Sequence, residues 1–203
     1  MTNLAPLNAE ELARRAQHEC GHAVVSWAQG IPFLRIVLGG AAGPMVYPVT
    51  GTRVLVGQRC LIQACGFIAD YQRRGLRMRG SQIAKLLLGG GDDRFEVDDP
   101  ATGQVAVRPS RAPALAPGGD MSDWTALIAA TRPPPAECIG LWRDCEGFAA
   151  ACRPAIDAVA AELLVLTELG YADASEIAAA AMSGMPPPAI PEWARPDPAA
   201  NRW

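Results

Sequence analysis

Residues 8–30 read NAEELARRAQHECGHAVVSWAQG, and this stretch predicts one long helix. Asn8 and Glu11 have the spacing of a capping box, in which the two side chains satisfy free amide groups of the first turn. Apolar residues then recur at helical spacing, and Gly30 can adopt the left-handed conformation that ends many helices. We therefore expect a helix over about residues 9–29.

The chain contains only two histidines, and both lie in this helix in the pattern H-E-x-x-H. His18 and His22 are four residues apart, so they share a helix face and both imidazoles can reach one metal ion. Glu19 can reach a water held by that metal. Gly21 costs the helix about 1 kcal/mol relative to alanine, which suggests that another element packs tightly against this face. The alternative is a pair of ordinary surface histidines.

Composition indicates one compact domain. The length is 203 residues and the net charge is −3, which gives no sign of a nucleic-acid footprint. No apolar run reaches the ~20 residues of a membrane span, and the first residues lack the features of a signal peptide. We expect a cytoplasmic protein with a domain over residues 1–185 and a proline-rich tail over residues 186–203.

The remaining pattern is mostly helical, so we expect a mainly α fold with a small β-sheet (α+β). Two to four strands should lie beside the motif helix, and a strand edge there could pair with an extended substrate, although an ordinary hairpin fits equally. Residues 89–118 are rich in Gly, Pro and Asp and are expected to be mobile, with one short strand at residues 102–107. The expected strands are 33–38 and 45–49, and the expected helices are 53–75, 118–131, 136–152, 154–169 and 173–182. Residues 81–88 are expected to form a short apolar helix or turn.

Three of the six cysteines, Cys138, Cys145 and Cys152, recur every seven residues and so form a helical stripe. A thiolate metal site is one interpretation of this stripe. We favour the other interpretation, in which small semi-apolar side chains pack in the core. In a cytoplasmic protein the cysteines are expected to be reduced rather than paired.

Beyond the first motif, the chain resembles the peptidase domain of the FtsH-type ATP-dependent zinc proteases over about residues 8–180. The family motif H-E-A-G-H-A matches residues 18–23, HECGHA, and a weaker counterpart of its Gly-Gly-Arg-x-Ala-Glu-Glu helix lies at residues 65–71, CGFIADY. Residues 119–123, GDMSD, match the position of the family's third zinc ligand, and residues 153–160, RPAIDAVA, resemble its final helix.

The resemblance implies a zincin-like helical peptidase domain that binds Zn²⁺ through His18, His22 and Asp123. Asp120, three residues earlier, is the alternative third ligand. Glu19 would be the catalytic base and would not bind the metal. These 203 residues contain no P-loop, so the expected partners are a polypeptide substrate and either further copies of this chain or a separate ATPase.

These features together predict a zinc metalloendopeptidase that hydrolyses peptide bonds in flexible polypeptides. Two alternatives stay open. One is a metal-binding scaffold or interaction protein with little or no catalytic activity. The other is an H-E-x-x-H peptidase of a different family that clips a repressor and uses another third ligand.

Overall fold

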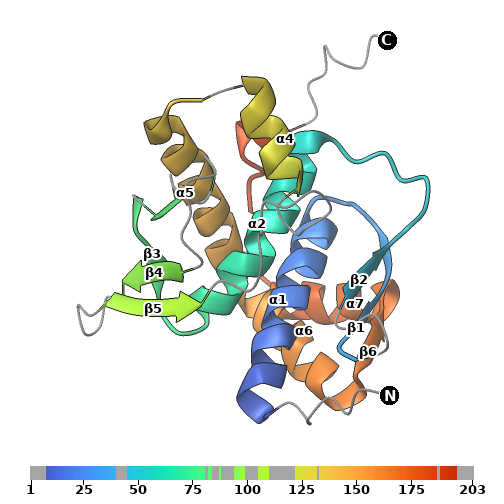
Figure 1. Cartoon of the computed structure of the whole chain (residues 1–203). Helices are drawn as coiled ribbons and strands as arrows, with labels where there is room; N and C mark the ends of the chain where they lie inside the picture. The colour runs from blue at the N-terminus through green and yellow to red at the C-terminus, as the bar shows by residue number, and fades with distance from the viewer. Residues whose placement is uncertain are drawn as a thin grey trace, which may run out of the picture.

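A computed structural model gives the fold. It describes residues 8–39, 45–80, 82–83, 87, 94–98, 105–109, 122–131, 133–186 and 188–195. Two helices pack side by side at its centre, α1 (Ala9–Ala28) and α2 (Val56–Gln72) (Figure 1). Around them lie α4 (Ser122–Thr131), α5 (Pro135–Ala151), α6 (Arg153–Leu166) and α7 (Tyr171–Ala181). The protein is therefore mainly helical with small antiparallel sheets, as the sequence predicts.

Helix α1 begins and ends as expected. The side-chain oxygen of Asn8 accepts a hydrogen bond from the Glu11 amide at 2.8 Å, which caps the first turn. Gly30 follows the helix with a φ of +70°, a conformation that a side chain would strain. The core-facing residues of α1 are fully buried, including Ala16, Cys20 and Val25.

The glycine inside the motif is explained by the crossing of α1 and α2. A Cβ atom at Gly21 would lie 2.6 Å from the Cys65 carbonyl oxygen and 2.9 Å from Gly66 Cα and from Ala69 Cβ. No side chain fits in that space, so the expectation of tight packing at Gly21 is confirmed.

Strand β1 (Phe33–Val37) is the middle strand of a three-stranded sheet, between β2 (Met45–Pro48) and β6 (Glu168–Gly170). Both pairings are antiparallel, and Ile36 lies opposite Val46 on one side and opposite Leu169 on the other. Both edges of β1 are therefore occupied. Any added strand would have to pair with β2 or β6, which corrects the idea of an open edge on the strand after the motif.

A second three-stranded antiparallel sheet contains β3 (Arg77–Met78), β4 (Arg94–Asp98) and β5 (Val105–Pro109). Strand β5 overlaps the short strand expected at residues 102–107, whereas β4 is a strand that was not expected in this segment. The rest of residues 89–118 lies outside the described residues. In the expected helix or turn over residues 81–88, the described residues 82, 83 and 87 are helical.

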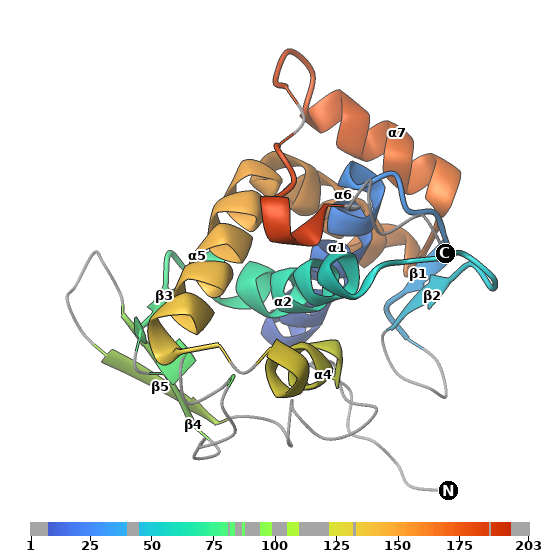
Figure 2. The ribbon, with the colours of Figure 1, turned by 90° about the horizontal axis from the view of Figure 1, so that it is seen from above.

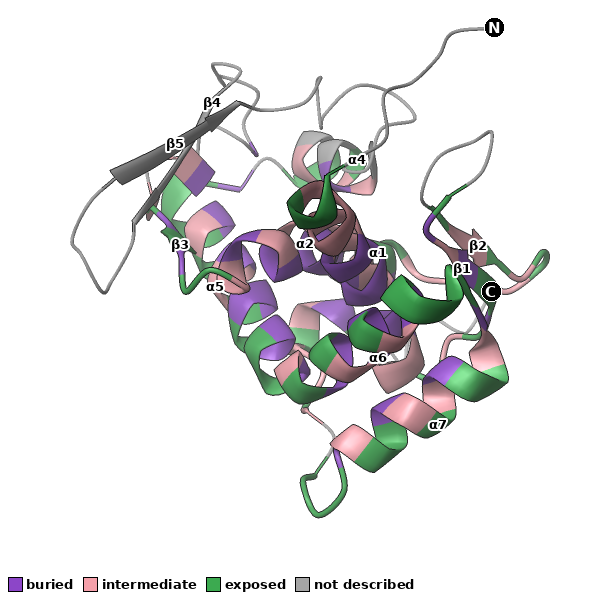
Figure 3. Cartoon of the chain, turned by 90° about the horizontal axis from the view of Figure 1, so that it is seen from below, coloured by how far each residue is buried: buried purple, intermediate pink, exposed green. Residues whose placement is uncertain are grey.

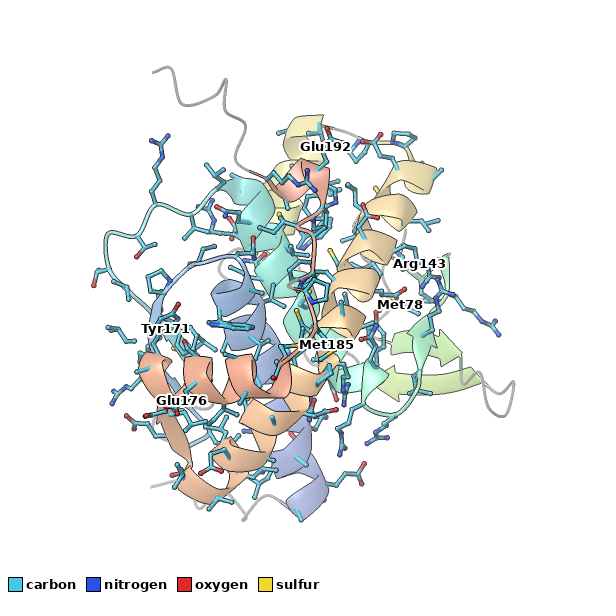
Figure 4. The ribbon with its side chains drawn as sticks, turned by 180° about the vertical axis from the view of Figure 1, so that it is seen from behind. Met78, Arg143, Tyr171, Glu176, Met185 and Glu192 are labelled. Atoms are coloured by element: carbon cyan, nitrogen blue, oxygen red, sulfur yellow. The ribbon has the colours of Figure 1, made fainter. Side chains whose placement is uncertain are left out.

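A buried polar network joins this second sheet to the helices. The Tyr71 hydroxyl donates to Glu146 Oε1 at 2.7 Å, and Trp142 Nε1 donates to the Tyr71 oxygen at 3.1 Å. Arg143 pairs with the same Glu146 carboxylate and donates to the Met78 carbonyl at 2.7 Å (Figure 4). Burial, followed by the charge of Glu146, raises the pKa of Tyr71 well above its usual value. The phenol therefore stays protonated as a donor.

The later helices match the predicted ones within a few residues, with one exception. Thr167 adopts a φ of +61° and ends α6, and residues 168–170 then form β6 instead of continuing the helix. In the tail, a short 3-10 helix (Glu192–Ala194) docks through Trp193, whose Nε1 donates to Asp144 Oδ2 at 3.1 Å.

Among the described residues, α1 and α2 contribute more buried positions than any other helix, while α6 and α7 expose their outer faces (Figure 3). The view from above shows α1 and α2 enclosed by α4, α5, α6 and α7 (Figure 2). All six cysteines are buried and unpaired, which supports the packing interpretation of the cysteine stripe. Among the helices that the structure describes, none combines the length and apolar character that crossing a membrane requires.

The crossing generates a first prediction. Gly21→Ala should lower the free energy of unfolding by about 1–3 kcal/mol, because the added methyl group meets the α2 backbone. Gly147→Ala is a matched control, since nothing lies within 4 Å of a Cβ at that helical position. It should be neutral or stabilise by up to about 1 kcal/mol. Urea denaturation of both variants measures the difference, and equal effects would contradict the close packing.

Candidate metal centre

The two histidines of the motif face each other on α1. Their Nε2 atoms are 3.1 Å apart, and the ring centroids are separated by 4.6 Å with the rings nearly perpendicular. A tetrahedral zinc ion with Zn–N distances of ~2.05 Å would place two ligand nitrogens ~3.3 Å apart. The pair therefore has the separation that binding to one ion through both Nε2 atoms requires.

Backbone groups of α2 fix the orientation of both rings. Nδ1 of His22 lies 2.9 Å from the Ile62 carbonyl oxygen, and the His18 ring has a hydrogen bond to the Gly66 backbone. A carbonyl only accepts, so Nδ1 of His22 donates to it, and Nε2 of His22 is the nitrogen that faces His18. Outer hydrogen bonds of this kind orient metal-binding histidines and set their tautomer.

Gly66 provides the space for the His22 ring. A Cβ atom at Gly66 would lie 2.3 Å from Cε1 of His22 and 2.4 Å from its Nε2. The second motif is therefore part of this site, because its glycine lets the imidazole lie directly on α2. Phe67, the next residue, contacts the His18 ring edge-on at a centroid distance of 5.3 Å.

Electrostatics keep His18 in the form that binds metals. Burial lowers its pKa well below the usual value, and the neighbouring charges of His22 and Arg14 lower it further. A neutral imidazole is the ligand form, whereas an imidazolium has no lone pair to offer. At neutral pH His18 is therefore a neutral imidazole and has no proton to lose before it could act as a ligand.

Glu19 is buried, with about 9% of its surface exposed. It follows His18 by one position, and its charge adds to the effect of burial in raising the pKa of the Cys20 thiol. A thiol with a raised pKa stays protonated and is a poor metal ligand. Cys20 is therefore a neighbour of the motif histidines rather than a candidate ligand.

Asp123, the expected third ligand, lies at the start of α4 and contacts α2. Its Oδ1 accepts from Arg59 Nε at 2.8 Å, and its Oδ2 accepts from Gln63 Nε2 at 2.7 Å. Its backbone amide also donates to Gln63 Oε1 at 3.2 Å. Asp120, the alternative ligand, lies outside the described residues.

The structure joins the two histidines but does not bring Asp123 or Glu19 into the same cluster. Within the part of the chain that it describes, no three His, Cys, Asp or Glu side chains lie close enough together to hold a metal ion. The contacts to His22 and to Asp123 nevertheless come from the same short segment of α2. Ile62 and Gly66 contact His22, and Gln63 between them contacts Asp123.

Sequence reasoning missed the α2 side of this site. Arg59 and Gln63 are four residues apart, a spacing that places both on one helix face, but nothing in the sequence links that face to Asp123. The glycine of the weakened second motif was the one available signal for Gly66. The Ile62 carbonyl is a backbone group that any residue type would supply, so the sequence could not indicate it.

Comparisons with known proteins add no assignment. No family model matches this sequence, and no curated protein does. The resemblance to FtsH-type peptidases therefore stays a prediction that rests on the motif residues.

The ring contacts generate a second prediction. In metal-free protein at neutral pH, imidazole ¹⁵N NMR should show His22 protonated at Nδ1, since the Ile62 carbonyl needs a donor. Gly66→Ala should displace the ring and replace this pattern by a mixture of tautomers, with a stability loss of about 1–3 kcal/mol. Gly140→Ala, where nothing lies within 4 Å of the added methyl group, is the control. An unchanged His22 spectrum in Gly66→Ala would contradict the geometry.

Proposed function

We propose that this chain is a zinc-dependent metallopeptidase-like protein that hydrolyses peptide bonds in flexible polypeptides. The observation that carries the proposal is the histidine pair, with Nε2 atoms 3.1 Å apart and with ring orientations fixed by α2. It sits within H-E-x-x-H, where an acidic residue follows the first histidine as the general base of this chemistry.

The two histidines fit a zinc ion in part. His18 and His22 fit two positions of a tetrahedral zinc ion, and an acidic ligand such as Asp123 would supply a third. When bound, Zn²⁺ would act as a Lewis acid that polarises the peptide carbonyl and makes water a better nucleophile. Burial supplies a neutral imidazole at His18, and the Ile62 carbonyl orients the His22 ring.

Glu19 has the remaining chemical role. Its carboxylate takes the proton from the attacking water and passes it to the leaving amine, which is general base catalysis followed by general acid catalysis. A residue that also served as a metal ligand could not do this. The outer strands β2 and β6 offer edges with which an extended substrate could pair, while β1 is filled on both sides.

The resemblance adds the expected setting. We propose a stand-alone FtsH-like peptidase domain that acts with further copies of itself or with a separate ATPase. The six unpaired cysteines support the expectation of a cytoplasmic, reducing location.

A second candidate function is a metal-binding scaffold without turnover. The contacts of Asp123 favour it, because its carboxylate is held by Arg59 and Gln63 rather than beside the histidines. Metal binding without peptide hydrolysis would select this second function, and the two experiments below separate them.

Elemental analysis of the purified protein should find about one zinc ion per chain. His18→Gln and His22→Gln should each weaken zinc binding by at least about 100-fold. Each removes a direct ligand of the metal, and this costs more affinity than the loss of a hydrogen bond that orients a ligand. Cys20→Ala should retain the metal and serves as the control within the motif. Asp123→Ala should lose much of the zinc and Asp120→Ala should keep it. The reverse result would exchange the two ligand assignments.

Glu19→Gln should bind zinc as the wild type does but cleave an unstructured polypeptide at least about 100-fold more slowly, since it removes the proton acceptor. Release of new amino termini from a flexible protein substrate, with and without chelator, measures the rate. Full activity in Glu19→Gln would contradict the peptidase mechanism. Absence of chelator-sensitive activity in the zinc-loaded wild type would favour the scaffold.

A further inference from the structure

We propose that Tyr71 is a redox-active residue and that three tryptophans carry single electrons between it and the surface. In order from the surface, the tryptophans are Trp193, Trp124 and Trp142. The partner is a one-electron oxidant of the class of high-valent metal complexes, which meets the protein at Trp193. An indole or a phenol can lose one electron and regain it, so a row of these rings in contact can pass electrons in short steps. This activity is separate from the proposed peptidase, and neither depends on the other.

The four rings form a continuous path from the tail to α2. The Trp193 and Trp124 ring centroids are 5.7 Å apart, and those of Trp124 and Trp142 are 6.0 Å apart. Centroid separations of this size are typical of interacting aromatic pairs. Trp142 Nε1 then donates to the Tyr71 oxygen at 3.1 Å. Each ring therefore touches the next, and no step has to cross a gap filled by other side chains.

Burial makes Trp193 the exposed end of this path. Trp124 and Trp142 have no exposed surface, and only 6% of Tyr71 is exposed. Trp193 is partly exposed, and it can lie on the core because Gly57 has no side chain. A Cβ atom at Gly57 would be 2.6 Å from the Trp193 carbonyl oxygen. An oxidant too large to enter the core therefore meets Trp193 first.

The hydrogen-bond partners differ between the ends of the path and its middle. At the inner end, the Tyr71 hydroxyl donates to the Glu146 carboxylate at 2.7 Å. At the outer end, Trp193 Nε1 donates to the Asp144 carboxylate at 3.1 Å. In the middle, Trp124 Nε1 donates to a backbone carbonyl of α2 at 2.6 Å. A carboxylate can take up a proton and a backbone carbonyl cannot, so an oxidised ring can become neutral only at the two ends.

Tyr71 is the end at which the missing electron should come to rest, because its proton acceptor is held in place. Arg143 and Arg77 both pair with the Glu146 carboxylate, which keeps it ionised before the electron leaves. Glu146 is itself buried, so water does not compete for the proton of the phenol. A polar network of this kind in the core fixes the geometry of the proton transfer.

The oxidation of Tyr71 moves one electron and one proton. The electron passes through Trp142, Trp124 and Trp193 in turn to the oxidant, which gains it. The O–H bond of Tyr71 breaks, its proton moves along the hydrogen bond to Glu146, and a neutral tyrosyl radical remains. One electron from a reductant of the ascorbate class returns by the same path, and the proton moves back to restore the phenol.

The test is flash oxidation of the full chain by photogenerated ruthenium(III) trisbipyridine, followed by transient absorption and electron paramagnetic resonance. Tyr47→Phe/Tyr171→Phe is the parent protein, because Tyr71 is then its only tyrosine. The parent should give a tyrosyl radical. In this parent, Trp124→Phe should lose most of the tyrosyl signal and leave a tryptophan radical in its place, because this oxidant does not oxidise phenylalanine.

Conservative variants keep the test independent of the fold. Trp193→Phe changes only the exposed end of the path and should also lose most of the tyrosyl signal. Trp27→Phe is the matched control, since it removes a partly buried tryptophan of α1 outside the path, and it should give the parent's yield. Glu146→Gln keeps an oxygen for the phenol but no base, so the tyrosyl radical should form more slowly. Thermal unfolding checks that each variant is folded.

The outcomes decide the inference on its own. Absence of a tyrosyl radical in the parent would show that Tyr71 is not redox-active. An unchanged tyrosyl yield in Trp124→Phe or Trp193→Phe would overturn the path, and so would an equal loss in Trp27→Phe. Zinc content and peptide hydrolysis should be the same in Trp193→Phe as in the wild type, so a failure of the proposed peptidase is measured separately.

Discussion

The close contact between α1 and α2 is the constraint on which the rest of the structure depends. Gly21 and Gly66 let the two backbones approach until no Cβ atom fits at either position. That approach brings the carbonyls of α2 within hydrogen-bond distance of the imidazoles on α1. A wider crossing would leave the rings without partners, so the same packing that fills the core also orients the histidine pair.

Helix α2 serves several parts of the molecule at once. One face supports the histidines, the Arg59–Gln63 face holds Asp123, and Tyr71 near its end joins the buried Glu146 of α5. The charged Glu146 is tolerated inside because Tyr71 and Arg143 both contact its carboxylate. Helix α2, which lies outside the first motif, thus positions the histidine pair, the candidate third ligand and the second sheet.

What the sequence could predict was local. Asn8, Gly30 and the periodic apolar residues act within a few positions of themselves, so the bounds of α1 followed from them. Strand β6 is short, and it exists because β1, far away along the chain, pairs with it. The same reason hid the environment of Asp123: its partner Gln63 is 60 positions away, and only the folded helices bring them together.

The pairing of β1 with β6 joins residues about 133 positions apart. A nascent chain leaving the ribosome would therefore complete the motif helix and the β1–β2 hairpin long before β6 emerged. Until then one edge of β1 would expose free amide and carbonyl groups, the kind of edge on which chains aggregate. During synthesis, β6 would thus be the strand that closes the open edge of β1. Until β6 is made, that edge would be the place where a chaperone that binds unpaired strands could attach.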